Sequence, residues 1–166
     1  KDPKWGGNWV LALGGQLGYG IGLAERDNGT KDLPLFERYF LGGNNSVGGF
    51  AERILGPRAP SNSRPRPPET DPVCRDTDVI GGEKAMVLSS EILFPIMEEY
   101  GIRGVAFFDM GNAFEDFSFA DLRKSVGAGV RWMSPFGPLR VELGFPLNTK
   151  PDDETSALGF SIGSQP

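Results

Sequence analysis

Two carboxylates, Glu91 and Asp109, are the residues of this sequence whose type and placement could support chemistry. Each is flanked by small or apolar residues, in the segments SSEILF and FFDMG. A facing carboxylate pair can act as the acid and base of a hydrolase, line a pore with charge, or hold a cationic group. The chain has no His, and no activated Ser or metal-ligand cluster accompanies the pair. We therefore expect a structural or docking role and no enzymatic activity, with the hydrolase and the pore as minor alternatives.

The composition narrows the classes of partner. The 166 residues carry a net charge of −5, which argues against a nucleic-acid partner, because such partners are bound by basic surfaces. Cys74 is the only cysteine, so one chain can form neither an internal disulfide nor a thiolate zinc site, and we expect a free thiol. We expect no cofactor and no metal. Glycine, at 24 residues, is about twice as frequent as average, which suits a β protein with many turns.

Apolar residues alternate with small or polar residues in six segments, which is the period-2 pattern of a β-strand. In the first segment the odd positions are apolar or aromatic, and the even positions are mostly small. The pattern predicts strands at residues 9–23, 85–94, 103–115, 125–132, 139–145 and 158–163. Several are close to the roughly 9 to 11 residues that a tilted strand needs to cross a bilayer.

The two faces of the predicted strands differ in a way that indicates a membrane. The apolar faces end in aromatic residues, and the opposite faces carry isolated charges among glycines. A lipid-facing band with aromatic girdles around a wet interior has this composition. Short connections, such as residues 134–138, also alternate with long ones, as expected when the two ends of a barrel face different compartments. The sequence therefore predicts an all-β, antiparallel transmembrane barrel, and a soluble small-ligand barrel is the alternative.

The connection at residues 24–84 stands out by its length of about sixty residues, because a loop this long is usually functional or disordered. Its first half is rich in aromatic residues and glycine and contains the tip NNSVGGFAER, at residues 44–53, so we expect it to be ordered. Its second half, RAPSNSRPRPPETDP, is polar and proline-rich and predicts a mobile linker. Within that half, SRPRPP could alternatively bind a proline-recognising domain.

Five segments together resemble the BamA family of outer-membrane protein assembly factors, within the bacterial surface antigen superfamily. In chain order they are PLFERYFLGGNNSVGGFAERILGP, GGEKAMVLSSEILFPI, AFFDMGNAFED, SVGAGVRWMSPFGPLRVELGFPL and LGFSIG. The resemblance covers nearly the whole chain. It implies that residues 1–166 are the C-terminal portion of an outer-membrane β-barrel domain, about six strands of a sixteen-stranded barrel, with residues 24–84 as its sixth extracellular loop. It also implies localisation in the bacterial outer membrane.

The function that the resemblance implies is non-enzymatic assembly and insertion of outer-membrane β-barrel proteins. The implied partners are the lipid bilayer, client β-barrel proteins and the lipoproteins of an assembly complex. A polypeptide-translocating barrel of two-partner secretion, in the same superfamily, is the alternative. In the family the last strand forms one side of a seam and carries a sorting signal, and the alternation of Leu158, Phe160 and Ile162 matches that strand. An ordinary edge strand is the other interpretation of these three residues.

The loop tip departs from the family at one position. The family carries a V-R-G-F/Y motif there, whose Arg contacts acidic residues on the inner wall, and those acidic positions correspond to Glu91 and Asp109. In this sequence the tip reads Val47, Gly48, Gly49 and Phe50. Gly48 therefore stands where the resemblance implies an Arg.

An Arg presents a planar fork of N–H donors, whereas a Gly offers only its backbone N–H and adds flexibility. We therefore predict a loosely held or displaced tip, with Glu91 and Asp109 lacking their usual counter-charge. Three other residues of the predicted inner face could supply that charge instead: Arg103, Arg131 and Arg140.

Six strands are too few for a closed membrane barrel, because known barrels begin at about eight strands. Open sheet edges in lipid would leave backbone N–H and C=O groups without partners. We therefore predict that this chain forms a homo-oligomer by pairing its strand edges with those of another copy.

Overall fold

The computed structural model describes residues 9–23, 33–58, 79–135, 137–150 and 153–163. Cys74 and the segment SRPRPP lie outside these ranges, as does most of the proline-rich half of the long connection. Within the described ranges, no helix is long and apolar enough to cross a membrane.

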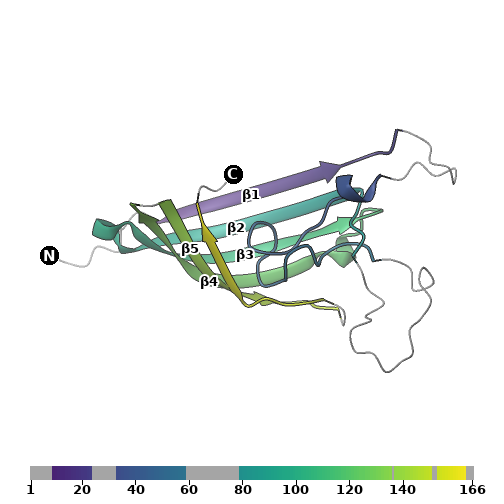
Figure 1. Ribbon diagram of the computed structural model, residues 1–166. Helices are drawn as coiled ribbons and strands as arrows, with labels where there is room; N and C mark the ends of the chain where they lie inside the picture. Colours follow the sequence, from purple (N-terminus) through teal and green to yellow (C-terminus); the bar gives the residue numbers. More distant parts are fainter. Residues whose placement is uncertain (1–8, 24–32, 59–78, 136, 151–152, 164–166) are drawn as a thin grey trace, which may run out of the picture.

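Six antiparallel strands form one sheet, in which each strand pairs with the next along the chain (Figure 1). They are β1 (Val10–Tyr19), β2 (Lys84–Met97), β3 (Ile102–Phe114), β4 (Arg123–Ser134), β5 (Gly137–Pro146) and β6 (Leu158–Ile162). Three short 3-10 turns complete the regular structure of the described residues: η1 (Leu35–Glu37), η2 (Glu98–Tyr100) and η3 (Phe119–Asp121). The predicted all-β, antiparallel fold is confirmed.

All six strands end at residues different from those predicted, and the differences are largest for β1 and β2. β1 ends at Tyr19 instead of residue 23, because its last partner is Lys84, the first residue of β2. β2 continues past residue 94 to Met97, with a register shift between Pro95 and Met97 in its pairing with β3. A proline lacks the N–H of a regular ladder, and a bulge is one of the few places in a sheet that accept it.

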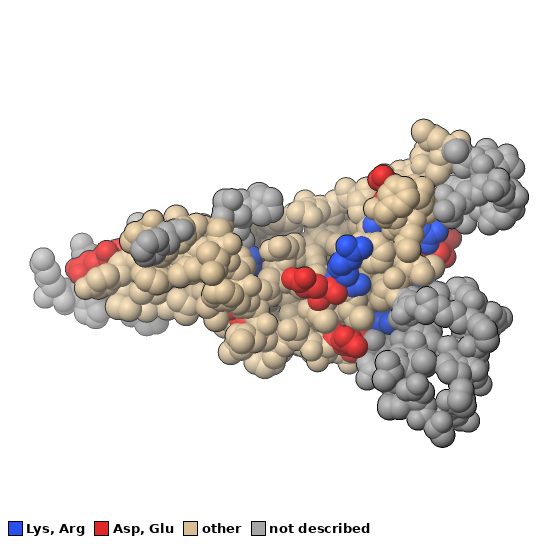
Figure 2. Space-filling view, viewed as in Figure 1, with Lys and Arg blue, Asp and Glu red and all other residues tan. Residues whose placement is uncertain are grey.

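The two ends of the sheet differ in the length of their connections (Figure 1). The turn end carries η2 and the tight turn between β4 and β5, and the loop end carries the connections from β1 to β2, β3 to β4 and β5 to β6. Gly101 closes η2 with a φ of 68°, a left-handed conformation that favours glycine. Figure 2 shows charged side chains at the turn end and across the loop-end half of the molecule, with a largely uncharged stretch between them.

The two faces of the sheet have different surroundings. Residues 33–58 lie over one face, which we call the inner face (Figure 1). On this face Val105 and Phe107 are only 1% and 6% exposed. On the opposite, outer face, Leu13 and Leu17 of β1 are 75% and 77% exposed. The alternation in the sequence thus separates a covered face from an open apolar one.

The long connection folds back over the inner face and has a small hydrophobic core of its own. Val47, Phe50 and Leu55 are buried together, and Leu41 and Ile54 pack against them. Leu41 and Leu55 exchange two backbone hydrogen bonds, of 3.1 and 2.9 Å, which close the base of the tip. The first half of the connection is therefore ordered, as its composition predicts.

Candidate functional site: the loop tip on the inner wall

The tip, at residues 44–53, and the two glycines before it form a compact turn whose shape depends on glycine. Gly42 and Gly43 have φ angles of 112° and 87°, which non-glycine residues rarely adopt. The Ser46 hydroxyl accepts a hydrogen bond from the Gly42 N–H at 2.8 Å, and the Gly43 N–H donates to the Phe50 carbonyl at 3.1 Å. These bonds satisfy the turn internally and direct Val47 and Phe50 toward the sheet.

The tip is docked on the inner face, which corrects the prediction of a displaced tip. Val47 and Phe50 are 0% and 1% exposed. The Gly48 N–H donates to Asp109 Oδ2 at 3.2 Å, and the Ser89 hydroxyl donates to Asp109 Oδ1 at 2.6 Å. Two apolar anchors and one backbone donor therefore hold the tip in place of an arginine side chain.

Inward-facing glycines of β3 and β5 form part of the surface on which the tip rests. A methyl group added at Gly111 of β3 would lie 3.0 Å from Val47 Cγ2, and one added at Gly144 of β5 would lie 2.7 Å from Gly49 Cα. Both distances are shorter than ordinary carbon contacts, so a side chain at either position would displace the tip. Gly49 itself has a φ of 81° and lies directly on the Gly144 backbone.

The ring of Phe107 explains why this wall accommodates a glycine at position 48. A methyl group added at Gly48 would lie 2.9 Å from Phe107 Cε2, and one added at Gly127 would overlap the same ring. Phe107 therefore fills the space next to Asp109 that a side chain at position 48 would need. Gly127 in β4 and Gly48 in the tip lack side chains and so leave the space that this ring occupies.

Glu91 has a different partner from Asp109. Arg131 of β4 donates two hydrogen bonds to the Glu91 carboxylate, at 2.6 and 2.8 Å. The same guanidinium also donates to Glu142 Oε1 of β5 at 3.1 Å. Bidentate pairs of this kind are among the strongest and most directional hydrogen bonds in proteins. Arg131 therefore supplies the counter-charge that Glu91 was predicted to lack.

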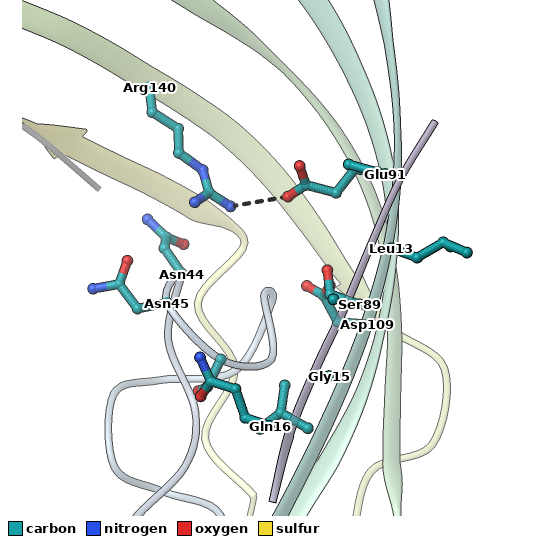
Figure 3. Close-up of a pocket in the computed structure, with 13 residues that line it drawn as sticks. Leu13, Gly15, Gln16, Asn44, Asn45, Ser89, Glu91, Asp109 and Arg140 are labelled. Atoms are coloured by element: carbon teal, nitrogen blue, oxygen red, sulfur yellow. Dashed lines mark hydrogen bonds and ion pairs between the residues drawn. The ribbon is translucent and has the colours of Figure 1, made fainter. Parts of the chain in front are cut away.

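Arg140 of β5 completes this cluster of four charges. Its guanidinium lies 2.6 Å from Glu142 Oε2 and 3.9 Å from Glu91 Oε1 (Figure 3). The Glu142 side chain is only 3% exposed, so its carboxylate depends on the two arginines in place of water. Arg103, the third candidate, is exposed. We call Glu91, Arg131, Arg140 and Glu142 the wall cluster.

A cavity of about 310 Å³ separates the tip from β1 and the wall cluster. Figure 3 shows Gln16, Asn44 and Asn45 around it and Leu13 pointing away from it, toward the outer face. Within the described ranges, no group of three or more acidic, Cys or His side chains is arranged to hold a metal ion. The side chains around the cavity offer polar docking contacts.

The structure separates the two carboxylates that the resemblance assigns to one contact. Asp109 binds the tip, whereas Glu91 binds the wall cluster. Leu158, Phe160 and Ile162 lie on the outer face of β6 and are 60–64% exposed. Sequence reasoning did not find Phe107, Glu142 or the glycines under the tip. Their only signal was the repeated placement of glycine on the inner face.

Comparisons with known proteins place the chain in a family. The model of the Omp85 superfamily domain matches residues 3–165. The outer membrane protein assembly factor BamA of Nitratidesulfovibrio vulgaris is 35% identical over 148 residues, which cover 86% of this chain and 17% of that protein. BamA of Neisseria meningitidis serogroup B is 27% identical over 186 residues, covering 94% and 22% respectively. The chain therefore spans about a fifth of the length of these relatives.

A solved structure has the same fold. The crystal structure of BamA from Haemophilus ducreyi lacking POTRA domains 1-3 superimposes with a TM-score of 0.69 at 24% sequence identity. The match covers 92% of this chain and 30% of that chain. The six-stranded sheet and its long connection thus occur within a larger solved barrel.

Proposed function

The chain belongs to the Omp85 superfamily and is a bacterial outer-membrane protein, and we propose that residues 1–166 are the C-terminal portion of the β-barrel of an outer-membrane protein assembly factor. In this proposal the protein folds and inserts client β-barrel proteins without catalysing a covalent reaction. Its partners are the bilayer, its clients and the lipoproteins of an assembly complex. The observation that carries the proposal is the long connection folded onto the inner face, with its tip at Asp109.

The outer face supports contact with lipid. Leu11, Leu13 and Leu17 of β1 and Phe160 of β6 are 60–77% exposed on this face. Apolar side chains at this exposure are expected on the lipid side of a membrane barrel, and their burial in the bilayer contributes about 25 cal/mol per Å² of apolar surface.

The mechanism rests on the free edge of β6. This strand of five residues pairs with β5 and with no other strand of the described chain. In β6 the backbone N–H and C=O groups of odd-numbered residues point toward β5. This follows from two hydrogen bonds next to the strand: the Gly163 N–H donates to the Pro138 carbonyl, and the Ala157 carbonyl accepts from the Gly144 N–H. The Phe160 N–H therefore points to the free edge, since backbone groups alternate sides along a strand. An incoming client strand could pair with that edge by β-augmentation.

The test compares two substitutions at one position. Phe160→Pro removes the outward N–H together with the aromatic side chain, whereas Phe160→Ala removes only the side chain. The complete protein is reconstituted in liposomes, and the folding of a urea-denatured client barrel is followed by its shifted mobility on a gel. We expect Phe160→Pro to reduce client folding at least tenfold relative to Phe160→Ala. Equal activity of the two variants would contradict a role for the β6 edge.

The same edges determine how residues 1–166 behave alone. We propose that two copies pair their free β1 and β6 edges, because unpaired backbone groups in lipid cost several kcal/mol each. Mass measurement of the chain in detergent should show an assembly larger than one copy. A purely monomeric, folded chain would rule out edge pairing.

A further inference from the structure

The tip touches more than the inner wall, because it also pairs with the segment that leads into β6. Phe50 and Thr155 form an antiparallel bridge. The Ala51 N–H donates to the Glu154 carbonyl at 2.9 Å, and the Ser156 N–H donates to the Gly49 carbonyl at 3.0 Å. Residues 49–51 and 154–156 therefore form a short ladder, although about a hundred residues of chain separate them.

Side-chain packing continues this contact into β6 itself. A methyl group added at Gly159 would overlap the side-chain amide of Asn44, so Asn44 lies directly on the β6 backbone. One residue before the strand, Ala157 accepts a hydrogen bond of 2.8 Å from the Gly144 N–H, beneath Gly49. The tip, β5 and the start of β6 thus meet at one place.

Outside the tip, the loop end of β6 is held by its pairing with β5 and by Asp153, whose carboxylate accepts a hydrogen bond of 2.6 Å from Arg123 of β4. β6 is half as long as β5, at five residues against ten, and its outer side chains are exposed. A cavity of about 230 Å³ remains between the tip and β6, bordered by Glu52 and Ser156 among others. Packing between the tip and β6 is therefore incomplete, and the hydrogen-bonded ladder and the Asn44 contact are what join these two parts.

We infer that the docked tip is a latch for the last strand, with Asn44 and Gly49 as its positioning residues. When the tip is docked, it fixes residues 154–159 and holds the start of β6 against β5. When the tip leaves the inner face, the segment loses its ladder and the loop end of β6 is released. The inference rests on the proposed function only where it makes β6 the edge that clients pair with. The coupling between the tip and β6 stands on the contacts alone.

Amide hydrogen exchange of the folded protein in lipid nanodiscs measures this coupling without any client. Gly49→Ala is the perturbation, because the added carbon would lie 2.9 Å from the Gly144 carbonyl carbon and its φ of 81° disfavours a side chain. Gly14→Ala is the matched control, since its added carbon would lie 3.9 Å from Ser89 Cβ, an ordinary contact on the same face.

In Gly49→Ala we expect exchange to rise at least about tenfold, the factor that corresponds to 1.4 kcal/mol, in both the tip and the two β6 amides that point to β5, those of Gly159 and Ser161. Exchange in β3 and β4 should be unchanged, and Gly14→Ala should match the unmodified protein. A mobile tip beside an unchanged β6 would overturn the inference. Unchanged exchange in the tip of Gly49→Ala would overturn the inference too, because it would show that the close contact between Gly49 and Gly144 does not hold the tip.

A pair of compensating substitutions keeps the test decisive if Gly49→Ala fails to fold. Gly159→Ala adds a methyl group that meets the amide of Asn44, and Asn44→Ala removes that amide. Each single variant should increase exchange in the tip and in β6, and the double variant should restore protection, because the methyl group fills the vacated space. Additive effects in the double variant would show that the two residues do not act through each other. Intact coupling in an unmodified complete protein that folds no client would instead count against the proposed function alone.

Discussion

Removing Arg131 should destabilise the sheet more than removing any exposed arginine of the inner face. Arg131 donates hydrogen bonds to both acidic members of the wall cluster, at 2.6 Å to Glu91 and 3.1 Å to Glu142. Arg131→Met keeps most of the side-chain length and removes the charge. It leaves Glu91 with Arg140, at 3.9 Å, as its nearest cation in the cluster.

The size of the effect follows from burial. Two unit charges about 4 Å apart attract by about 4 kcal/mol at an effective dielectric constant of 20, but the hydration that both charges lose on burial offsets part of this attraction. Breaking a buried pair from one side costs about 3–5 kcal/mol. Because the side chains of Glu91 and Arg131 are 18% and 19% exposed, we expect the lower end of that range, about 3 kcal/mol.

Urea unfolding in detergent micelles, followed by tryptophan fluorescence, measures this loss. With a slope of about 1–3 kcal/mol per M, a loss of about 3 kcal/mol lowers the midpoint by roughly 1–3 M. Arg103→Met is the matched control, because Arg103 is exposed, and its midpoint should change little. Adding Glu91→Gln to Arg131→Met should recover part of the loss, since it removes an unpaired buried charge.

Equal midpoints for Arg131→Met and Arg103→Met would refute the reasoning, because they would show that the wall cluster is screened like a surface ion pair. A further loss on adding Glu91→Gln would refute it as well. In that case Glu91 would contribute through contacts other than its charge.

Three further predictions concern the tip, the lipid face and the loop end. Phe50→Ala should destabilise the docked tip by about 3–5 kcal/mol, because Phe50 is 1% exposed, and limited proteolysis within the tip should accelerate. Val130→Arg, on the outer face of β4, should cost about 2–4 kcal/mol if it lies near the bilayer midplane, which folding yield into liposomes measures. A hydrogen bond from Lys150, at 2.8 Å, lowers the pKa of Asp121 below its ordinary value of 3.8, and Lys150→Met should raise that pKa in an NMR titration.

Each of these has its own control or contrary outcome. Phe36→Ala changes an 84% exposed ring and should leave proteolysis of the tip unaltered. Phe145→Arg lies on the same outer face, one residue from the end of β5, so it should cost less than Val130→Arg, and an equal cost would argue against a membrane band. Because the folded pKa of Asp121 is depressed, its stabilising contribution is present above pH 3.8 and is lost as the pH falls through the folded value. A pKa unchanged by Lys150→Met would contradict this pairing.

The alternation of apolar and small residues was enough to predict the sheet. It placed Glu91 and Asp109 on the inner face and Leu158, Phe160 and Ile162 on the outer face, where the structure has them. Strand ends were less predictable, because they depend on the partner strand. β1 continued in pattern to Leu23 but ends at Tyr19, where β2 begins.

The state of the tip could not be predicted from the tip sequence. The substitution of Gly48 for an arginine suggested a displaced tip, since charge was the only attachment visible in the motif. Docking instead depends on Phe107, Gly111 and Gly144, which are distant in sequence and are brought under the tip by the strand register. The pairing of Glu91 with Arg131 likewise required the order of β2, β3 and β4.

The measurement that tests the docked, arginine-free tip most directly is a proton–proton contact between Gly48 and the ring of Phe107. The 18.0 kDa chain can be labelled at Gly and Phe and studied by NMR in detergent micelles. A cross-peak between the Gly48 α-protons and the Phe107 ring is expected, because a carbon added at Gly48 would lie 2.9 Å from Phe107 Cε2. Absence of the cross-peak, with random-coil shifts for residues 44–53 beside an intact sheet, would contradict the docking of the tip.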